Sequence, residues 1–152
     1  MNRGNFFRRG LLALLLIVAG LFLANGIAYA DTSDDIQKYT AQIAQNPNDA
    51  EAYNNRGVAH AELKQYDKAL ADFNKAIELE PNYAVAYYNR GFLHLLAGGG
   101  VDPAFKDATK AIQINPDFAA AYNLRGMCYQ VWGEFKKAQA DFDKAKELGY
   151  NG

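Results

Sequence analysis

The chain has 152 residues, which is enough for one modest domain. It carries 16 Lys and Arg against 17 Asp and Glu, and three of these bases, Arg3, Arg8 and Arg9, lie among the first thirty residues. Subtracting those three leaves 13 bases against 17 acids, so residues 31–152 carry a net charge of about −4. This argues against nucleic-acid binding, because neutralising phosphates supplies most of that affinity. The single cysteine, Cys128, excludes an internal disulfide, so packing alone must stabilise the fold.

The first thirty residues have the three-part pattern of a secretory signal peptide. The basic segment precedes an uninterrupted apolar run of 14 residues, Leu11–Ala24. Ala28 and Ala30 then place small residues at the −3 and −1 positions before Asp31. We therefore expect export to the periplasm or an equivalent lumen, with a mature N-terminus at Asp31. The alternative is that residues 11–30 stay uncleaved and anchor the chain in the membrane, although the run is short for a bilayer span of ~20 residues.

The remainder of the chain repeats itself in three units, residues 50–83, 84–118 and 119–152. The first half of each unit carries a tyrosine, an arginine three positions later and then a glycine: Tyr53, Arg56 and Gly57; Tyr87, Arg90 and Gly91; Tyr122, Arg125 and Gly126. The second half carries an alanine, then a phenylalanine or alanine four positions later, then an alanine three positions after that: Ala69, Phe73 and Ala76; Ala104, Ala108 and Ala111; Ala138, Phe142 and Ala145. Pro81 and Pro116 close the first two units. Each unit is typical of two amphipathic helices, and stacking of units supplies a core that one helix pair cannot build.

This pattern resembles the tetratricopeptide repeat (TPR) over residues 50–152, with arginine at one position where the family signature has leucine. The resemblance implies an all-α fold, a right-handed superhelix of antiparallel helix pairs with three repeats. Residues 34–45 fit an unpaired second helix, because Ile36, Tyr39 and Ile43 fall at the matching apolar positions. We therefore expect residues 31–49 to form an N-terminal cap helix.

The end of the array is also visible in the sequence. Two positions of each second helix should face the following repeat, and they are apolar in the first two repeats: Leu70 and Ile77, then Phe105 and Ile112. In the third repeat they become Gln139 and Lys146. The last helix has a polar face where a further repeat would stack, so we expect the array to stop there.

The resemblance implies that the first helix of each repeat lines a concave groove, in which a peptide segment of another protein lies. The expected lining residues are Asn54, Asn55, Val58, Tyr88, Asn89, Phe92, Asn123 and Met127. Amide side chains can both donate to and accept from an extended backbone. The apolar row Val58, Phe92 and Met127 would receive side chains of the ligand. The other interpretation is that the asparagines are merely tolerated on a solvent-facing surface.

Some TPR domains clamp a C-terminal carboxylate with basic side chains on these helices. Here Ala120 and Leu124 stand where the third repeat should present charge, which disfavours a chaperone tail as the ligand.

Three arginines recur in register with three aspartates, sixteen or seventeen residues later: Arg56 with Asp72, Arg90 with Asp107 and Arg125 with Asp141. We expect ion pairs between the two helices of each repeat, because a charge at a packing position must be neutralised. An anion-binding stripe is the alternative.

Other reactive residues have structural interpretations. His60 and His94 occupy equivalent positions where the family packs a tyrosine, and neither has a set of metal ligands beside it in the pattern. Cys128 lies inside a first helix and is expected to pack. The Gly98–Gly100 run lacks the residues of a phosphate loop, so we interpret it as a loosened turn, or a loop that contacts a partner, before Asp102 caps the next helix.

The sequence shows no catalytic constellation, and Ser33 is its only serine. We therefore expect no enzyme activity, no cofactor, no metal and no small-molecule substrate. The favoured function is an exported adaptor or assembly scaffold that binds a protein or peptide partner. The alternatives are a membrane-tethered assembly factor for an envelope or photosynthetic complex, with membrane contact only through residues 1–30, and a self-associating structural protein that forms homo-oligomers.

Overall fold

The structure is a computed structural model that describes residues 31–151, and the expected signal peptide lies outside these residues. An N-terminal helix covers residues 31–45. It is followed by α2 (Ala50–Glu62), α3 (Tyr66–Leu79), α4 (Ala84–Leu96), α5 (Val101–Ile114), α6 (Ala119–Val131) and α7 (Phe135–Glu147). Within residues 31–151 the chain forms helices and turns and no strands. No helix among these residues has the length and apolar content that crossing a membrane requires.

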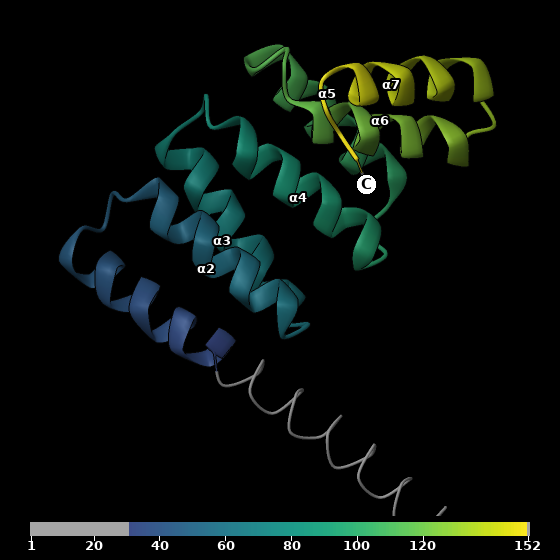
Figure 1. The fold of residues 1–152 in the computed structure, drawn as a ribbon. Helices are drawn as coiled ribbons and strands as arrows, with labels where there is room; N and C mark the ends of the chain where they lie inside the picture. The colour runs from purple at the N-terminus through teal and green to yellow at the C-terminus, as the bar shows by residue number, and fades with distance from the viewer. Residues whose placement is uncertain (1–30, 152) are drawn as a thin grey trace, which may run out of the picture.

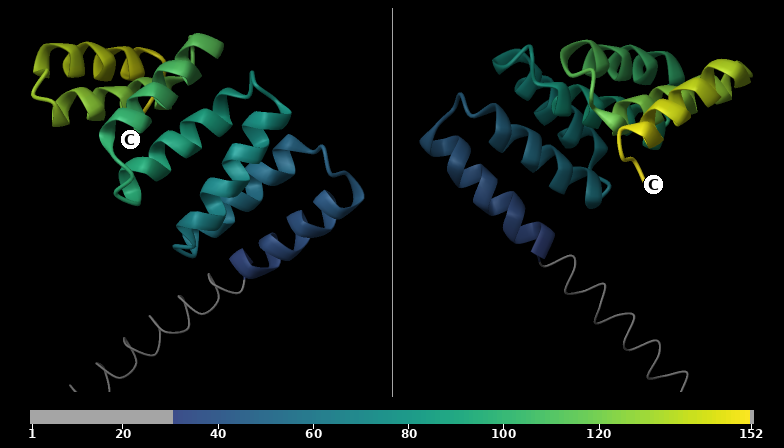
Figure 2. Two further views of the ribbon diagram at one scale, coloured as in Figure 1. Left: turned by 180° about the vertical axis from the view of Figure 1, so that it is seen from behind. Right: turned by 45° about the horizontal axis from the view of Figure 1, so that its top comes forward.

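The helices pair and stack as the repeat predicts (Figure 1). The antiparallel pairs are α2 with α3, α4 with α5 and α6 with α7, and each pair packs on the next through α3 against α4 and α5 against α6. Further views show the N-terminal helix lying against the first pair and the third pair turned relative to it (Figure 2). The fold is the all-α TPR superhelix that the sequence predicts.

Close approach within each pair depends on the recurring glycine. A Cβ atom built on Gly57 would lie 2.7 Å from Cε1 of Phe73, and one on Gly126 would lie 2.6 Å from the same atom of Phe142. The aromatic ring of the second helix therefore occupies the space that a side chain on the first helix would take. Phe73 is 2% exposed, so this contact forms part of the core.

The predicted ion pairs are present in all three repeats. Arg56 Nη2 lies 2.7 Å from Asp72 Oδ1, and Arg90 Nη2 makes the same contact with Asp107 Oδ1 at 2.7 Å. In the third repeat Arg125 Nε lies 2.7 Å from Asp141 Oδ2. Each guanidinium donates through Nε and Nη2 to both carboxylate oxygens, a planar two-bond geometry that lysine could not reproduce. The aspartates are buried, so each pair joins the two helices of its repeat from within.

The two positions that face the following repeat differ between the second and third repeats. Ile112 is buried against the third repeat and Phe105 packs on Tyr129 with ring centroids 5.2 Å apart. Gln139 and Lys146, at the equivalent positions of α7, are exposed.

The turn at Gly98–Gly100 differs from its prediction in one respect. Gly98 and Gly100 have φ angles of 73° and 107°, which glycine adopts freely. Gly100 holds the N-cap position and α5 begins at Val101, so Asp102 lies in the first turn of the helix instead of capping it. With Gly100 as the N-cap, α5 begins two residues earlier than a cap at Asp102 would allow.

His60 and Cys128 pack as expected. His60 is 8% exposed and its Nδ1 lies 2.9 Å from Oε1 of Gln65. Cys128 is fully buried, and burial raises the pKa of its thiol to about 11. At neutral pH this thiol is protonated and shielded from reagents.

Candidate functional site

Three adjoining hollows form one trough across the N-terminal helix, α2 and α4. The first has a volume of about 330 Å³ and is lined by Lys38, Tyr39, Gln42, Asp49, Glu51, Ala52 and Asn55. The second, of about 120 Å³, shares Tyr39 and Asn55 with the first. The third, of about 220 Å³, shares Val58 and Glu62 with the second. The trough therefore runs from the N-terminal helix along α2 to α4.

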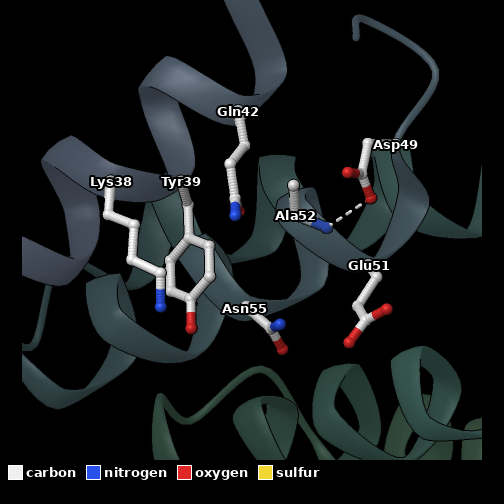
Figure 3. A pocket seen from close by; sticks show the side chains of 7 residues that line it. All are labelled: Lys38, Tyr39, Gln42, Asp49, Glu51, Ala52 and Asn55. Carbon is white, nitrogen blue, oxygen red and sulfur yellow. Dashed lines mark hydrogen bonds between the residues drawn. The ribbon is translucent and has the colours of Figure 1, made fainter. Parts of the chain in front are cut away.

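The first hollow is polar, and the N-terminal helix forms one of its walls (Figure 3). Lys38, Tyr39 and Gln42 project from that helix toward the side of α2 that carries Asn55. Asp49 is the N-cap of α2, and its Oδ1 accepts a hydrogen bond of 2.9 Å from the Ala52 amide. This cap fixes the first turn of α2 beside the hollow.

The trough has an acidic character at this end. Its first two hollows are lined by one basic residue, Lys38, and by the four acids Asp35, Asp49, Glu51 and Glu62, a formal balance of −3. Part of this charge already has a partner, because Glu62 Oε2 accepts from Thr32 Oγ1 at 3.2 Å. A basic side chain would be favoured here over an acidic one.

The third hollow is apolar. Its wall consists mainly of Val58, Ala61, Phe73, Phe92, Leu93 and Leu96. Phe92 and Leu96 are 43% and 53% exposed, so they present apolar surface to solvent at the rim. An apolar side chain of a ligand would bury this surface on binding.

The structure brings four of the eight predicted groove residues to the trough. Asn55 lines its first two hollows, Val58 its last two, and Asn89 and Phe92 the third. These residues come from α2 and α4, so two successive first helices share the trough.

Asn54 lies beneath this surface. It is 3% exposed, its Oδ1 accepts a 2.8 Å hydrogen bond from Asn89 Nδ2, and its own Nδ2 donates to Asn55 Oδ1 over 3.2 Å. The Asn54 amide therefore bonds Asn55 and Asn89 and holds these two side chains in position, instead of facing a ligand.

The other three predicted residues lie near the C-terminal end of the chain. Asn123 Nδ2 donates to the Tyr150 hydroxyl over 3.3 Å and approaches Met127 Sδ at 3.7 Å. Tyr88 stacks on Phe92 with centroids 6.3 Å apart, and burial raises its pKa, with a further contribution from Tyr150. The residues after α7 thus fold back onto this part of the face.

The fold-back depends on the end of α7. Gly149 has a φ angle of 92°, and the Tyr150 amide donates to the Ala145 carbonyl over 2.9 Å. This glycine-centred turn reverses the chain and directs Tyr150 toward α6.

Several trough residues were missed by the sequence interpretation. Lys38 and Gln42 belong to a helix that was treated only as a cap, and Leu96 is the last residue of α4. The signal for the cap helix was its apolar stripe, which includes Tyr39. The neighbours of that stripe could have been proposed as lining residues on helical spacing alone.

No group of three or more His, Cys, Asp or Glu side chains within the described part of the chain is arranged to hold a metal ion.

Comparison with known proteins agrees with the fold. A tetratricopeptide-repeat family model matches residues 50–83, and a second such model matches residues 73–99 and 108–140. No curated protein matches the sequence.

Solved structures share the fold, and two of them are more than 30% identical to this chain. A crystal structure of MamA is 31% identical, with a TM-score of 0.69 over 77% of this chain and 68% of the other. The TPR domain of Arabidopsis OM64 is 32% identical, with a TM-score of 0.63 over 66% of this chain and 82% of that domain. The second TPR domain of Spaghetti (RPAP3), bound to the HSP90 peptide SRMEEVD, is 24% identical, with a TM-score of 0.63 over 69% and 97% of the two chains, and shows the shared fold alone. On its repeats, its fold and these matches, the chain belongs to the tetratricopeptide-repeat family.

Proposed function

We propose that this chain is an exported, non-enzymatic interaction module that holds an extended peptide segment of a protein partner, as an adaptor or assembly scaffold. The observation that carries the proposal is the trough across the N-terminal helix, α2 and α4, with amides among its lining residues and a half-exposed aromatic side chain at its rim. The fold is suited to this role, since the related domain of Spaghetti was solved with a peptide bound.

The chemistry of the trough suggests what the peptide contains. The acidic hollow beside Lys38 favours a basic side chain, and the apolar hollow beside Phe92 favours a large apolar one. Asn55 and Asn89 line these hollows, and the amide groups that Asn54 does not use, Nδ2 of Asn55 and Oδ1 of Asn89, would bond the peptide backbone. We therefore propose a segment with a basic residue toward the N-terminal helix and an apolar residue toward α4.

Crosslinking from inside the trough tests this function. A photoreactive phenylalanine analogue at Phe92 is expected to capture a partner in the native cells, and synthetic peptides from the captured region should compete for that crosslink. The matched control carries the same analogue at Gln113, an exposed position of α5 on the other helix layer. Capture only from Gln113, or a Phe92 crosslink that no peptide of the partner displaces, would contradict the proposal.

Export is tested separately by mass. The pattern of residues 1–30 leads us to propose cleavage before Asp31, and the intact mass of the protein recovered from its compartment should correspond to residues 31–152. A full-length species in the membrane fraction would favour the membrane-tethered assembly factor. A mass in solution that is a multiple of the chain would favour the self-associating protein.

A further inference from the structure

The turn between α6 and α7 carries the largest concentration of exposed apolar side chains in the described structure. Val131 and Phe135 are 65% and 68% exposed, and Trp132 between them is 42% exposed. Gly133, with a φ angle of 75°, makes the turn tight, and the three residues fall within five positions of the chain at the tip of a helix pair. Solvent-exposed apolar groups gathered in this way mark an interaction surface.

The surface is held in place by aromatic packing. The Trp132 ring lies 4.9 Å from the Phe105 ring and 6.1 Å from the Tyr129 ring, measured between centroids. Phe105 and Tyr129 themselves are 5.2 Å apart. Trp132 therefore presents a fixed edge to solvent, which lowers the entropic cost of burying it against a partner.

A further repeat is a poor occupant of this surface. Such a repeat would also have to cover Gln139 and Lys146, which are exposed along the same helix α7. The apolar groups are confined to the turn, so the surface suits a partner that approaches the edge of the superhelix and not its end.

This edge also carries the start of the described chain. Thr32, at the start of the N-terminal helix, bonds Glu62 at the end of α2, so residue 31 lies at the edge where the first helices end. The ribbon of Figure 1 and the view from behind in Figure 2 place the start of the N-terminal helix and the turns after α2, α4 and α6 along that one edge. Residues 1–30, with the apolar run Leu11–Ala24, therefore join the fold at the same edge that exposes Trp132 and Phe135.

From this arrangement we infer that, in the membrane-tethered form that keeps residues 1–30, the edge carrying Val131, Trp132 and Phe135 rests on a lipid bilayer surface. Tryptophan suits the boundary between headgroups and acyl chains, because its ring is apolar and its N–H stays hydrated. Lys136 follows directly and is exposed, and its long side chain can reach headgroups while Phe135 enters the acyl region, whereas Lys137 pairs with Glu134 at 3.3 Å. Acids such as Glu134 share the edge, so apolar burial and not net charge supplies the attraction.

The chain contains a single tryptophan, which makes Trp132 a reporter of this contact. The full-length chain is reconstituted into phosphatidylcholine vesicles, with acyl chains either brominated or plain. Trp132 is expected to lose most of its fluorescence in the brominated lipid, because bromine quenches only at short range. The control moves the reporter to the opposite edge, as Trp132→Phe with Asn82→Trp in the exposed α3–α4 turn, and its emission is expected to be equal in both lipids.

Two serine substitutions test the neighbouring side chains. Val131→Ser with Phe135→Ser is expected to restore most of the Trp132 emission in brominated lipid, while Val85→Ser, an exposed valine of α4 away from this edge, leaves the quenching unchanged. Circular dichroism checks that each variant is folded. Equal Trp132 emission in the two lipids, or equal quenching of the Asn82→Trp reporter, overturns the inference. Shielding of Trp132 from acrylamide that depends on protein concentration and not on lipid also overturns it, in favour of a protein contact.

Discussion

Asn89 of α4 donates a 2.8 Å hydrogen bond to Asn54 of α2, and this bond joins two successive first helices beneath the trough. Asn54 is almost fully buried, so its amide oxygen cannot turn to water if the donor is lost. The bond therefore couples the stacking of the repeats to the shape of the proposed binding surface.

Replacing Asn89 with alanine should lower the free energy of unfolding by about 1–3 kcal/mol, because it leaves a buried acceptor without its donor. The measurement is urea denaturation followed by circular dichroism. The control is Gln113→Ala, which removes an exposed amide of α5. If the two variants lose the same stability, the bond does not hold the first helices together.

The regular part of the fold could be predicted from the sequence, because the residues that determine it recur at the same positions of each repeat. Gly57 and Gly126 are needed where an aromatic ring fills the space of a side chain, and the Arg90–Asp107 pair satisfies a charge at a packing position. The same spacing appears in each repeat, so helix pairs, ion pairs and the polar face of α7 all followed from alignment of the chain with itself.

The trough was harder to predict, because the rotation of each helix about its axis decides which of its side chains line the trough. Asn54 and Asn55 are adjacent in sequence but about 100° apart around the helix, so one is buried and the other lines the trough. Only the packing of α4 shows which is which. The hydrogen bond between Asn123 and Tyr150 depends on the positive φ angle of Gly149 after α7. This glycine has no equivalent in the first two repeats, so the repeat pattern does not predict the contact.

Two ion pairs of equal length allow the effect of burial on their contribution to stability to be compared. Arg90 with Asp107 and Lys75 with Glu78 both have N–O distances of 2.7 Å, but Asp107 is buried and Glu78 is exposed. Asp107→Asn should cost about 2–4 kcal/mol, because the guanidinium keeps its charge between the helices without a carboxylate. Glu78→Gln should cost less than about 1 kcal/mol. Similar losses in denaturant unfolding would show that burial does not set the strength of these pairs.

The polar face of α7 should keep the protein from associating through its end. Gln139→Leu with Lys146→Ile converts this face to the apolar type that the first two repeats stack, so the variant is expected to form dimers or larger species. The control is Lys106→Ile with Gln113→Leu, two exposed positions of α5 with the same spacing. Light scattering over a range of concentrations gives the mass. A Gln139 and Lys146 variant that keeps the mass of the parent at high concentration would argue against the assigned end of the array.

The last prediction separates binding from folding at two positions of the first helices. Phe92 is 43% exposed at the rim of the apolar hollow, whereas a side chain on Gly57 would collide with Phe73 at 2.7 Å. Phe92→Ala should therefore weaken binding of the captured partner by about 1–3 kcal/mol, since a few aromatic side chains often dominate such affinities. Its melting temperature should fall only slightly. Gly57→Leu should do the reverse and unfold the first repeat whether or not the partner is present. Both quantities are measured for each variant, with affinity taken on the folded fraction. If Phe92→Ala melts as early as Gly57→Leu while its folded fraction binds normally, Phe92 belongs to the core. The partner would then have to bind another surface, such as the convex face or the Gly98–Gly100 turn.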